Sequence, residues 1–263
     1  MKEQITITTH PVVVALAATF LFIECVLLLH GPLLLLDVLL VFSLTLAAYS
    51  FPFLNGTPLG GNKLVNQIFF VLAVISAVIS LILGGMLPRM LVLNSCFILF
   101  FFYRFGSSLG FSFRGSPMLK GPVIALCWTI ITVYLPVNIY KITIDNFELV
   151  SMLMLNFCMV LAMSWLCDLA DLKNDAEKGL QTITVLIGSK NTILLLLLVM
   201  IVCTAALTLL VPLSSAVLKG ALVADALTGL AILAVSKLPV SSAKWMVDAL
   251  MLCKPLAVIC LLA

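Results

Sequence analysis

The chain has 263 residues, of which 63% are hydrophobic, and its mean hydropathy is +1.30. Its 14 basic and 11 acidic residues make up 10% of the chain, where soluble domains carry about a quarter. A soluble domain cannot bury so much apolar surface, because its outside must be covered with polar groups. The net charge of +3 is small, so the composition also excludes a nucleic-acid-binding module. We therefore expect an all-α, polytopic membrane protein.

The apolar residues form long runs separated by Pro, Gly, Asp and Asn. A transmembrane helix needs about 20 apolar residues, and these runs are too long for barrel strands. The sequence predicts nine transmembrane helices, at residues 11–30, 32–54, 67–85, 88–103, 120–140, 147–167, 192–213, 216–236 and 245–263.

The basic residues predict the orientation of these helices. Nine spans place the N-terminus on the same side as the connections that follow the even-numbered helices. Ten of the 14 basic residues lie on that side, which includes the three long connections 51–66, 104–119 and 168–191. The positive-inside rule then predicts a cytoplasmic N-terminus and a C-terminus on the opposite side.

An acidic cluster follows the sixth predicted helix. Asp168, Asp171 and Asp175 stand at i, i+3 and i+7, so on a continuous helix they span an arc of roughly 60°. Three carboxylates on one face repel one another unless a cation neutralises them, and open-sided carboxylate sites are typical of Mg²⁺. Lys178 follows on the same side and suits a diphosphate. The alternative is a solvated helix end whose charges mark the membrane boundary.

A second polar segment connects the fourth and fifth predicted helices. It contains Tyr103, Arg114 and Lys120. Cations opposite an acidic metal site would bind the outer oxygens of a diphosphate. The alternative is that these cations only flank the membrane on its cytoplasmic side.

These features together resemble the UbiA superfamily of intramembrane prenyltransferases. Its second aspartate-rich motif reads D-x-x-D-x-x-x-D, then Gly, Thr and a short apolar stretch that ends in Gly. The corresponding residues of this chain are Asp168, Asp171, Asp175, Gly179, Thr182, Val185 and Gly188. The Tyr103–Lys120 segment is similar to the family's connection after its fourth helix.

The resemblance implies one UbiA-like domain over residues 1–263, a two-halved bundle of nine helices with a central cavity. In such a protein Mg²⁺, held here by the three aspartates, would bind a prenyl diphosphate at the cytoplasmic face. Ionisation would give an allylic cation, which an aromatic or other lipophilic acceptor would capture. An apolar tunnel open to the bilayer would shield that cation from water.

The first aspartate-rich motif of the superfamily is absent. No carboxylate occurs between Asp37 and Asp145, and the corresponding loop offers only the amide oxygens of Asn55, Asn62 and Asn66. An amide is a weaker Mg²⁺ ligand than a carboxylate. Either one metal on the second motif suffices, or Mg²⁺-dependent ionisation has been lost.

Other functions stay open at this level. A UbiA-fold terpene cyclase would quench the cation within its own chain, and a non-catalytic relative would only bind prenyl lipids. The intramembrane residues Glu24, Asp37, Asp225, Asp248 and Lys254 also allow a transporter, since buried charges are costly and often functional. For two of them we predict a structural role instead, as an Asp225–Lys254 pair that joins the last two helices.

Overall fold

The computed structural model describes residues 11–50, 63–84, 89, 119–177, 179, 181–210, 215–235 and 237–262. All regular structure in these ranges is helical, without a strand, which confirms the all-α prediction for them. The helices are α1 (Pro11–Leu28), α2 (Leu35–Ser50), α3 (Lys63–Gly84), α5 (Lys120–Thr129), the π-helical turn η3 (Ile130–Tyr134), α6 (Leu135–Tyr140), α7 (Asn146–Ala170), α8 (Leu172–Glu177), α9 (Ile183–Leu210), α10 (Ser215–Val235) and α11 (Val240–Leu262).

Eight of the nine predicted apolar runs coincide with these helices, and α5, η3 and α6 together form the fifth. The fourth run, 88–103, lies outside the described residues except for Arg89. The largest difference is α9, which begins nine residues before its apolar run. The extra turn is separated from the rest of α9 by a kink at Gly188, whose φ of 78° and ψ of 163° favour glycine. The final glycine of the motif thus lets the chain turn into the long helix.

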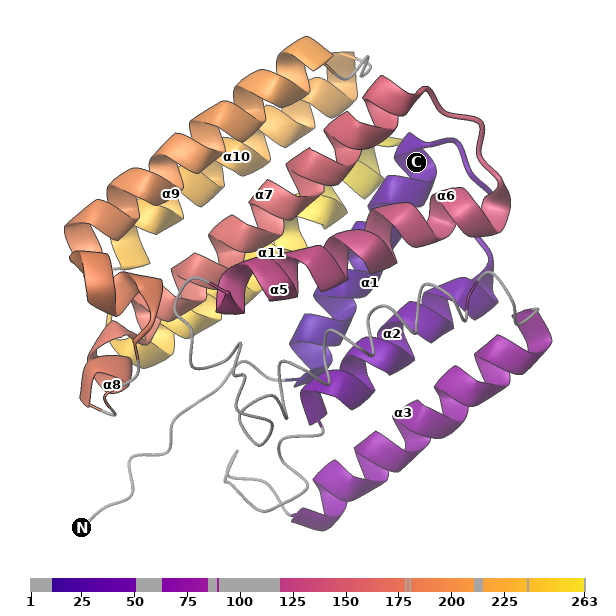
Figure 1. Ribbon diagram of the computed structural model, residues 1–263, viewed down its shortest axis with the longest axis horizontal. Coiled ribbons are helices and arrows are strands. Elements are labelled where there is room, and N and C mark those ends of the chain that lie inside the picture. The colour runs from indigo at the N-terminus through magenta and orange to yellow at the C-terminus, as the bar shows by residue number, and fades with distance from the viewer. Residues whose placement is uncertain are drawn as a thin grey trace.

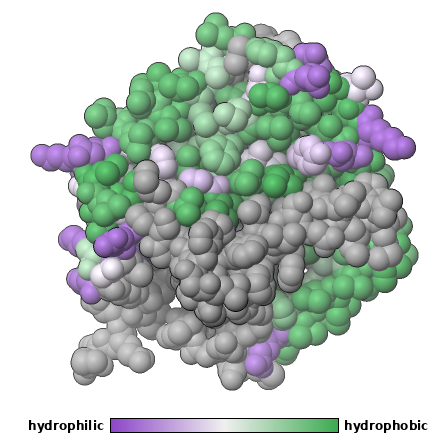
Figure 2. All heavy atoms as spheres, viewed as in Figure 1, coloured by the Kyte–Doolittle hydropathy of each residue, from purple (hydrophilic) through white to green (hydrophobic). Residues whose placement is uncertain are grey.

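Several helices have the length and composition of membrane spans. In the described part of the chain, four are long and apolar enough, at Pro11–Leu28, Lys120–Tyr140, Asn146–Ala170 and Ile183–Ala206. Large apolar side chains of α3 and α9 are exposed, among them Leu72, Ile82, Leu194 and Ile201, and hydrophobic residues cover much of the visible surface (Figure 2). Such a surface suits lipid and not water. The chain is a multi-pass membrane protein.

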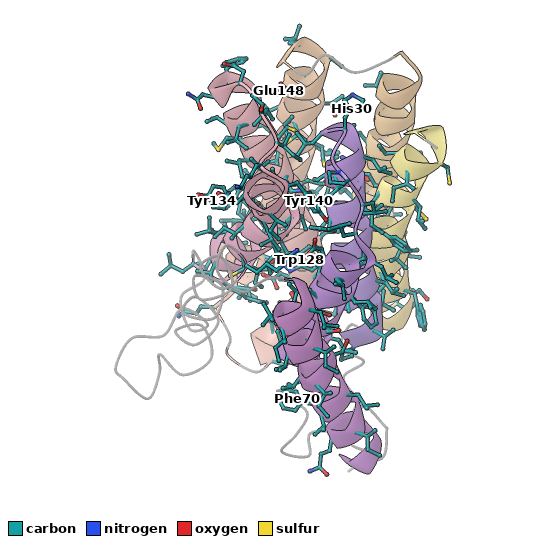
Figure 3. All side chains as sticks on the ribbon, turned by 90° about the vertical axis from the view of Figure 1, so that its right-hand side faces the viewer. His30, Phe70, Trp128, Tyr134, Tyr140 and Glu148 are labelled. Carbon is teal, nitrogen blue, oxygen red and sulfur yellow. The ribbon has the colours of Figure 1, made fainter. Side chains whose placement is uncertain are left out.

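The helices pack into two groups that share α7 (Figure 1). One apolar core joins α1, α2, α5, η3 and α7 around Phe22 and Trp128. The other joins α7, α9, α10 and α11 around Leu166, Leu196 and Ile232. Helix α1 also packs on α11, while α3 packs on α2. Trp128 therefore lies inside the bundle and Phe70 of α3 at its edge, as Figure 3 shows.

Polar contacts also connect helices inside the bundle. Asp37 is 1% exposed and accepts hydrogen bonds from Arg89 Nε at 2.7 Å, Arg89 Nη2 at 3.1 Å and Tyr140 Oη at 2.9 Å. A forked Arg–carboxylate contact of this kind is strong and directional. Asp37 is thus fully engaged with Arg89 and Tyr140, which argues against its use in an ion path.

Candidate functional site

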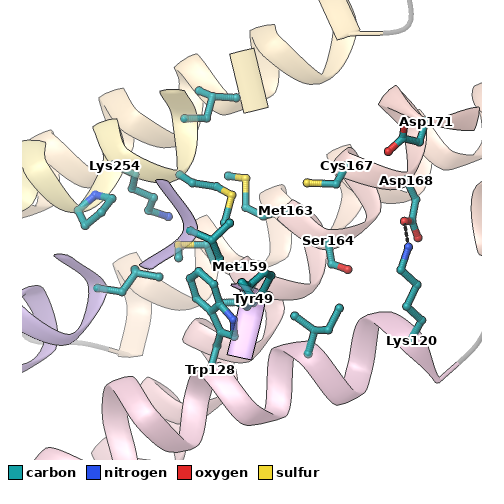
Figure 4. A pocket seen from close by; sticks show the side chains of 17 residues that line it. Tyr49, Lys120, Trp128, Met159, Met163, Ser164, Cys167, Asp168, Asp171 and Lys254 are labelled. Carbon is teal, nitrogen blue, oxygen red and sulfur yellow. Dashed lines mark hydrogen bonds and ion pairs between the residues drawn. The ribbon is translucent and has the colours of Figure 1, made fainter. Parts of the chain in front are cut away.

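A cavity of about 250 Å³ runs between α1, α2, α5, α7 and α11. Most of its wall is apolar, with aromatic rings and thioethers, and charged groups stand at its two ends (Figure 4). The lining residues are Val14, Leu21, Tyr49, Lys120, Ile124, Trp128, Met159, Val160, Met163, Ser164, Cys167, Asp168, Asp171, Leu250, Met251, Lys254 and Pro255.

The lining residues recur at helical spacing. Lys120, Ile124 and Trp128 stand at i, i+4 and i+8 on the segment that begins with α5. The α7 lining residues 159, 163 and 167 follow the same spacing, which continues to the cap residue 171. Residues four apart share one face of a helix, so each stripe leads from a charged end into the apolar interior.

At one end, which we call the mouth, Lys120 of α5 forms an ion pair with Asp168 of α7. The Asp168 side chain is 6% exposed and that of Lys120 27%, and both face the cavity. Gly121 allows this contact, because a Cβ there would lie only 2.8 Å from Trp165 Nε1. The small residue lets α5 approach α7 closely. The two charged segments predicted to face each other thus meet at this pair.

The backbone at Asp168 is held from the start of α9. Thr184 Oγ1 donates a hydrogen bond to the Asp168 carbonyl at 3.3 Å, and the Thr182 and Thr184 hydroxyls are 2.9 Å apart. The last carbonyls of a helix lack intrahelical donors, so this contact satisfies one of them. Thr184 therefore supports the end of the helix that carries the aspartates, and the motif residue Thr182 contacts Thr184.

The prediction that all three aspartates share one face of a continuous helix is wrong. Helix α7 ends at Ala170, and Asp171 caps it with φ −95° and ψ 2° before α8 begins. Asp168 and Asp171 line the cavity, whereas Asp175 is buried away from it. Short side chains that hydrogen-bond locally favour helix ends over helix interiors, which is why the motif interrupts the helix.

The metal prediction rests on this acidic end. Within the described ranges, no group of three or more His, Cys, Asp or Glu side chains is arranged to hold a metal ion. Asp168 and Asp171 nevertheless offer two carboxylates to the same cavity. Mg²⁺ is usually held by one or two carboxylates and completes its shell with water and phosphate oxygens. The donor chemistry of this pair therefore fits Mg²⁺ that arrives with a phosphate ligand.

At the other end, which we call the floor, Lys254 of α11 lines the cavity. Its ammonium lies 2.6 Å from Asp225 Oδ1 of α10, and Thr204 of α9 donates to Asp225 Oδ2 at 2.8 Å. The predicted Asp225–Lys254 pair is confirmed. The contact with Thr204 was not predicted, because α9 is apolar on all sides and its sequence does not show which side faces α10.

Several predicted site residues cannot be placed. Asn55, Asn62, Tyr103, Arg114 and Lys178 lie outside the described residues. Asn66 belongs to α3, but its side chain is not described. Their roles stay predictions.

The residues of the apolar cavity wall were not predicted from the sequence. The sequence assigns no functional role to the lining residues Trp128, Met159, Met163 and Ser164. The available signal was the four-residue spacing that connects Lys120 to Trp128 and Asp171 to Met159. Polar and soft side chains on one stripe of an apolar helix indicate an internal face and not a lipid-facing one.

Comparison with known proteins decides the family. The sequence model of the VviA prenyltransferase family matches residues 118–253, which hold α5 to α10, most of α11 and the Lys120–Asp168 pair of the cavity. The chain belongs to the VviA prenyltransferase family. A search of the curated proteins found no match.

The fold of this VviA family member is that of the UbiA superfamily. It is similar to the apo structure of a UbiA homolog from Aeropyrum pernix K1, with a TM-score of 0.63 and 15% identity. The match covers 96% of this chain and 99% of the other. The resemblance inferred from residues 168–188 is thereby confirmed.

Proposed function

We propose that the chain is an intramembrane prenyltransferase that moves an isoprenyl group from a prenyl diphosphate to an aromatic or other lipophilic acceptor. One observation carries the proposal: a single cavity joins Lys120, Asp168 and Asp171 to an apolar, aromatic wall. A prenyl diphosphate has the same polarity, since a charged head is bonded to a hydrocarbon tail. In this account the diphosphate binds at the mouth and the tail lies along α7.

Asp168 and Asp171 would hold Mg²⁺ together with the diphosphate. The metal supplies charge neutralisation to the leaving group. Asp175 lies outside the cavity, so its predicted role as a ligand depends on a rearrangement at α8.

Lys120 has a role of its own in this account. In the structure its ammonium is paired with Asp168. A diphosphate at the mouth offers the same ammonium a more highly charged partner, and charge-assisted hydrogen bonds to phosphate oxygens are strong. Lys120 would therefore exchange from Asp168 to the diphosphate, which leaves the carboxylate available for the metal.

In the reaction itself the protein has to shield the allylic cation from water, and it supplies no nucleophile of its own. The C1–O bond of the prenyl diphosphate breaks and its electron pair leaves with the diphosphate. A nucleophilic atom of the acceptor bonds to C1, and the acceptor loses a proton. Trp128 and Tyr49 line the cavity, and an aromatic ring face would stabilise a nearby cation, while Ile124 and Met163 would help to exclude water.

The remaining expectations complete the proposal. The mouth faces the cytoplasm if the positive-inside orientation holds, with the N-terminus on that side. Tyr103, Arg114 and Lys178 would add contacts to the diphosphate, and Asn55, Asn62 and Asn66 would replace the missing first motif.

A second candidate is a non-catalytic protein that binds prenyl lipids. It is favoured by the lack of any carboxylate between Asp37 and Asp145. In the described residues, moreover, no three acidic, histidine or cysteine side chains form a metal-binding group. This candidate predicts binding of the same ligands without release of pyrophosphate.

The test is release of pyrophosphate from geranyl, farnesyl and geranylgeranyl diphosphate by the purified protein, with Mg²⁺ and with EDTA. Asp168→Asn serves as the site variant and Asp37→Asn as a matched control, because Asp37 is a buried carboxylate outside the cavity. We expect release that needs both Mg²⁺ and Asp168. Retained binding without release would favour the non-catalytic candidate, and no binding would refute both.

A further inference from the structure

The floor of the cavity is charged, although a prenyl tail is purely hydrocarbon. Lys254 reaches the floor from α11, and Figure 4 shows it across the cavity from Asp168, Asp171 and Lys120. Its side chain is 13% exposed and that of Asp225 7%. The pair is therefore part of the bundle interior, with the ammonium on the cavity side and the carboxylate behind it.

Two further polar groups lie near Lys254. Pro255 also lines the cavity, and a proline inside a helix leaves the carbonyl four residues earlier, that of Met251, without its usual donor. Glu24 of α1 lies within electrostatic range of Lys254 and Asp225. A hydrocarbon chain that extended past Lys254 would desolvate these groups and offer no hydrogen bond in return.

We propose that the Lys254–Asp225 pair is a specificity determinant that sets the maximum length of the prenyl chain. The stretch of α7 that lines the cavity, from Asp168 to Met159, gives the length. At a rise of about 1.5 Å per residue, Asp168 and Met159 lie about 14 Å apart along α7. An extended isoprene unit advances by about 5 Å, because its four carbon–carbon bonds of about 1.5 Å each follow a zigzag at their bond angles. The cavity thus accommodates about two to three units, the length of a geranyl or farnesyl group.

This inference rests on the proposed function, since it assumes that the head group binds at the mouth. Its new claim is that the charged pair at the opposite end excludes longer tails. A wall built only of apolar side chains would reject them less sharply, because such side chains can repack.

The first experiment measures the affinity of unreactive thiolodiphosphate analogues with two, three, four and six isoprene units. The variant is Lys254→Met/Asp225→Leu, which removes both charges and so leaves none buried alone. The wild type should bind the two- or three-unit analogue best. The double variant should bind the four-unit analogue about tenfold more tightly than the wild type does, since burial of one more unit adds affinity.

The control is Asp37→Leu/Arg89→Met, which removes a buried carboxylate–cation pair outside the cavity. It should leave the length preference unchanged. If the Lys254/Asp225 variant binds the analogues with an unchanged length preference, the pair does not limit the chain length, and the proposed function still stands. Failure of every analogue to bind the wild type would overturn both.

A second experiment uses only the wild type, so it does not depend on how the variants fold. A farnesyl thiolodiphosphate with a diazirine at its far end is bound and irradiated, and the labelled peptide is mapped. Labels should fall on Leu21, Met159 or residues 251–255. Labels confined to α3 or to the lipid-facing residues of α9 would contradict the claim that the tail ends at Lys254.

Discussion

The two ends of the cavity each carry a lysine–aspartate pair, and the pairs differ in one respect that separates their roles. At the mouth both Lys120 and Asp168 line the cavity, and the Lys120 side chain is 27% exposed. At the floor only Lys254 lines it, while Asp225 is held behind by Thr204. A ligand can reach both partners at the mouth and only one at the floor. We therefore propose that the same residue types make an exchangeable pair at one end and a permanent pair at the other.

The largest effect should come from breaking the permanent pair on one side only. Lys254→Met leaves the Asp225 carboxylate buried without its cation, which costs about 3–5 kcal/mol for pairs of this kind. The double change Lys254→Met/Asp225→Leu should restore most of this loss. Thermal unfolding in detergent measures both variants, and equal melting temperatures for wild type and Lys254→Met would refute the pair's structural role.

At the mouth the aspartates should matter for turnover and little for stability. We expect Asp168→Asn and Asp171→Asn each to reduce pyrophosphate release by about a hundredfold or more, the scale for loss of a key charged group. Their unfolding free energy should change by about 1 kcal/mol or less, since the Lys120 ammonium is partly solvated. Asp175→Asn is the matched comparison, because Asp175 does not line the cavity; a loss as large there would place the reacting head group nearer α8.

The geometry of the mouth also depends on Gly121. Gly121→Ala would place a Cβ 2.8 Å from Trp165 Nε1 and 3.0 Å from Leu161 Cδ1. Because the neighbours must shift, we expect a loss of about 1–3 kcal/mol in unfolding free energy and weaker diphosphate binding. Gly229→Ala is a suitable control, since a Cβ there meets nothing within 4 Å. Equal binding by both variants would show that the α5–α7 approach does not position Lys120.

The smallest effect should come from Lys120. Lys120→Met should raise KM for the diphosphate about tenfold, with a smaller change in kcat, since the ammonium binds the head group in both ground and transition states. Lys120→Arg should recover part of the affinity, because a guanidinium also binds phosphate. Steady-state kinetics over a range of diphosphate concentrations separates KM from kcat, and a normal KM in Lys120→Met would contradict the exchange at the mouth.

The sequence predicted the UbiA superfamily and much of the helix order, because apolar length and an aspartate motif are local signals. It also predicted the Asp225–Lys254 pair, since burial of a charge is less costly when a charge of opposite sign lies beside it. It could not predict the Asp37–Arg89–Tyr140 contacts, which join residues 52 and 103 positions from Asp37 in the sequence. The break at Asp171 was missed because helical periodicity does not show where a helix ends, and a helix apolar on all sides conceals which stripe faces a cavity.

The central claim is that the head of a prenyl diphosphate binds at the mouth and its tail runs to the floor. The most direct test is a structure of the wild-type protein with farnesyl thiolodiphosphate and Mg²⁺. The account predicts phosphate oxygens next to Lys120, with its ammonium moved away from Asp168, and a tail that lies along Met163 and Met159 and ends at Lys254. A diphosphate bound elsewhere, with the Lys120–Asp168 pair intact, would contradict it.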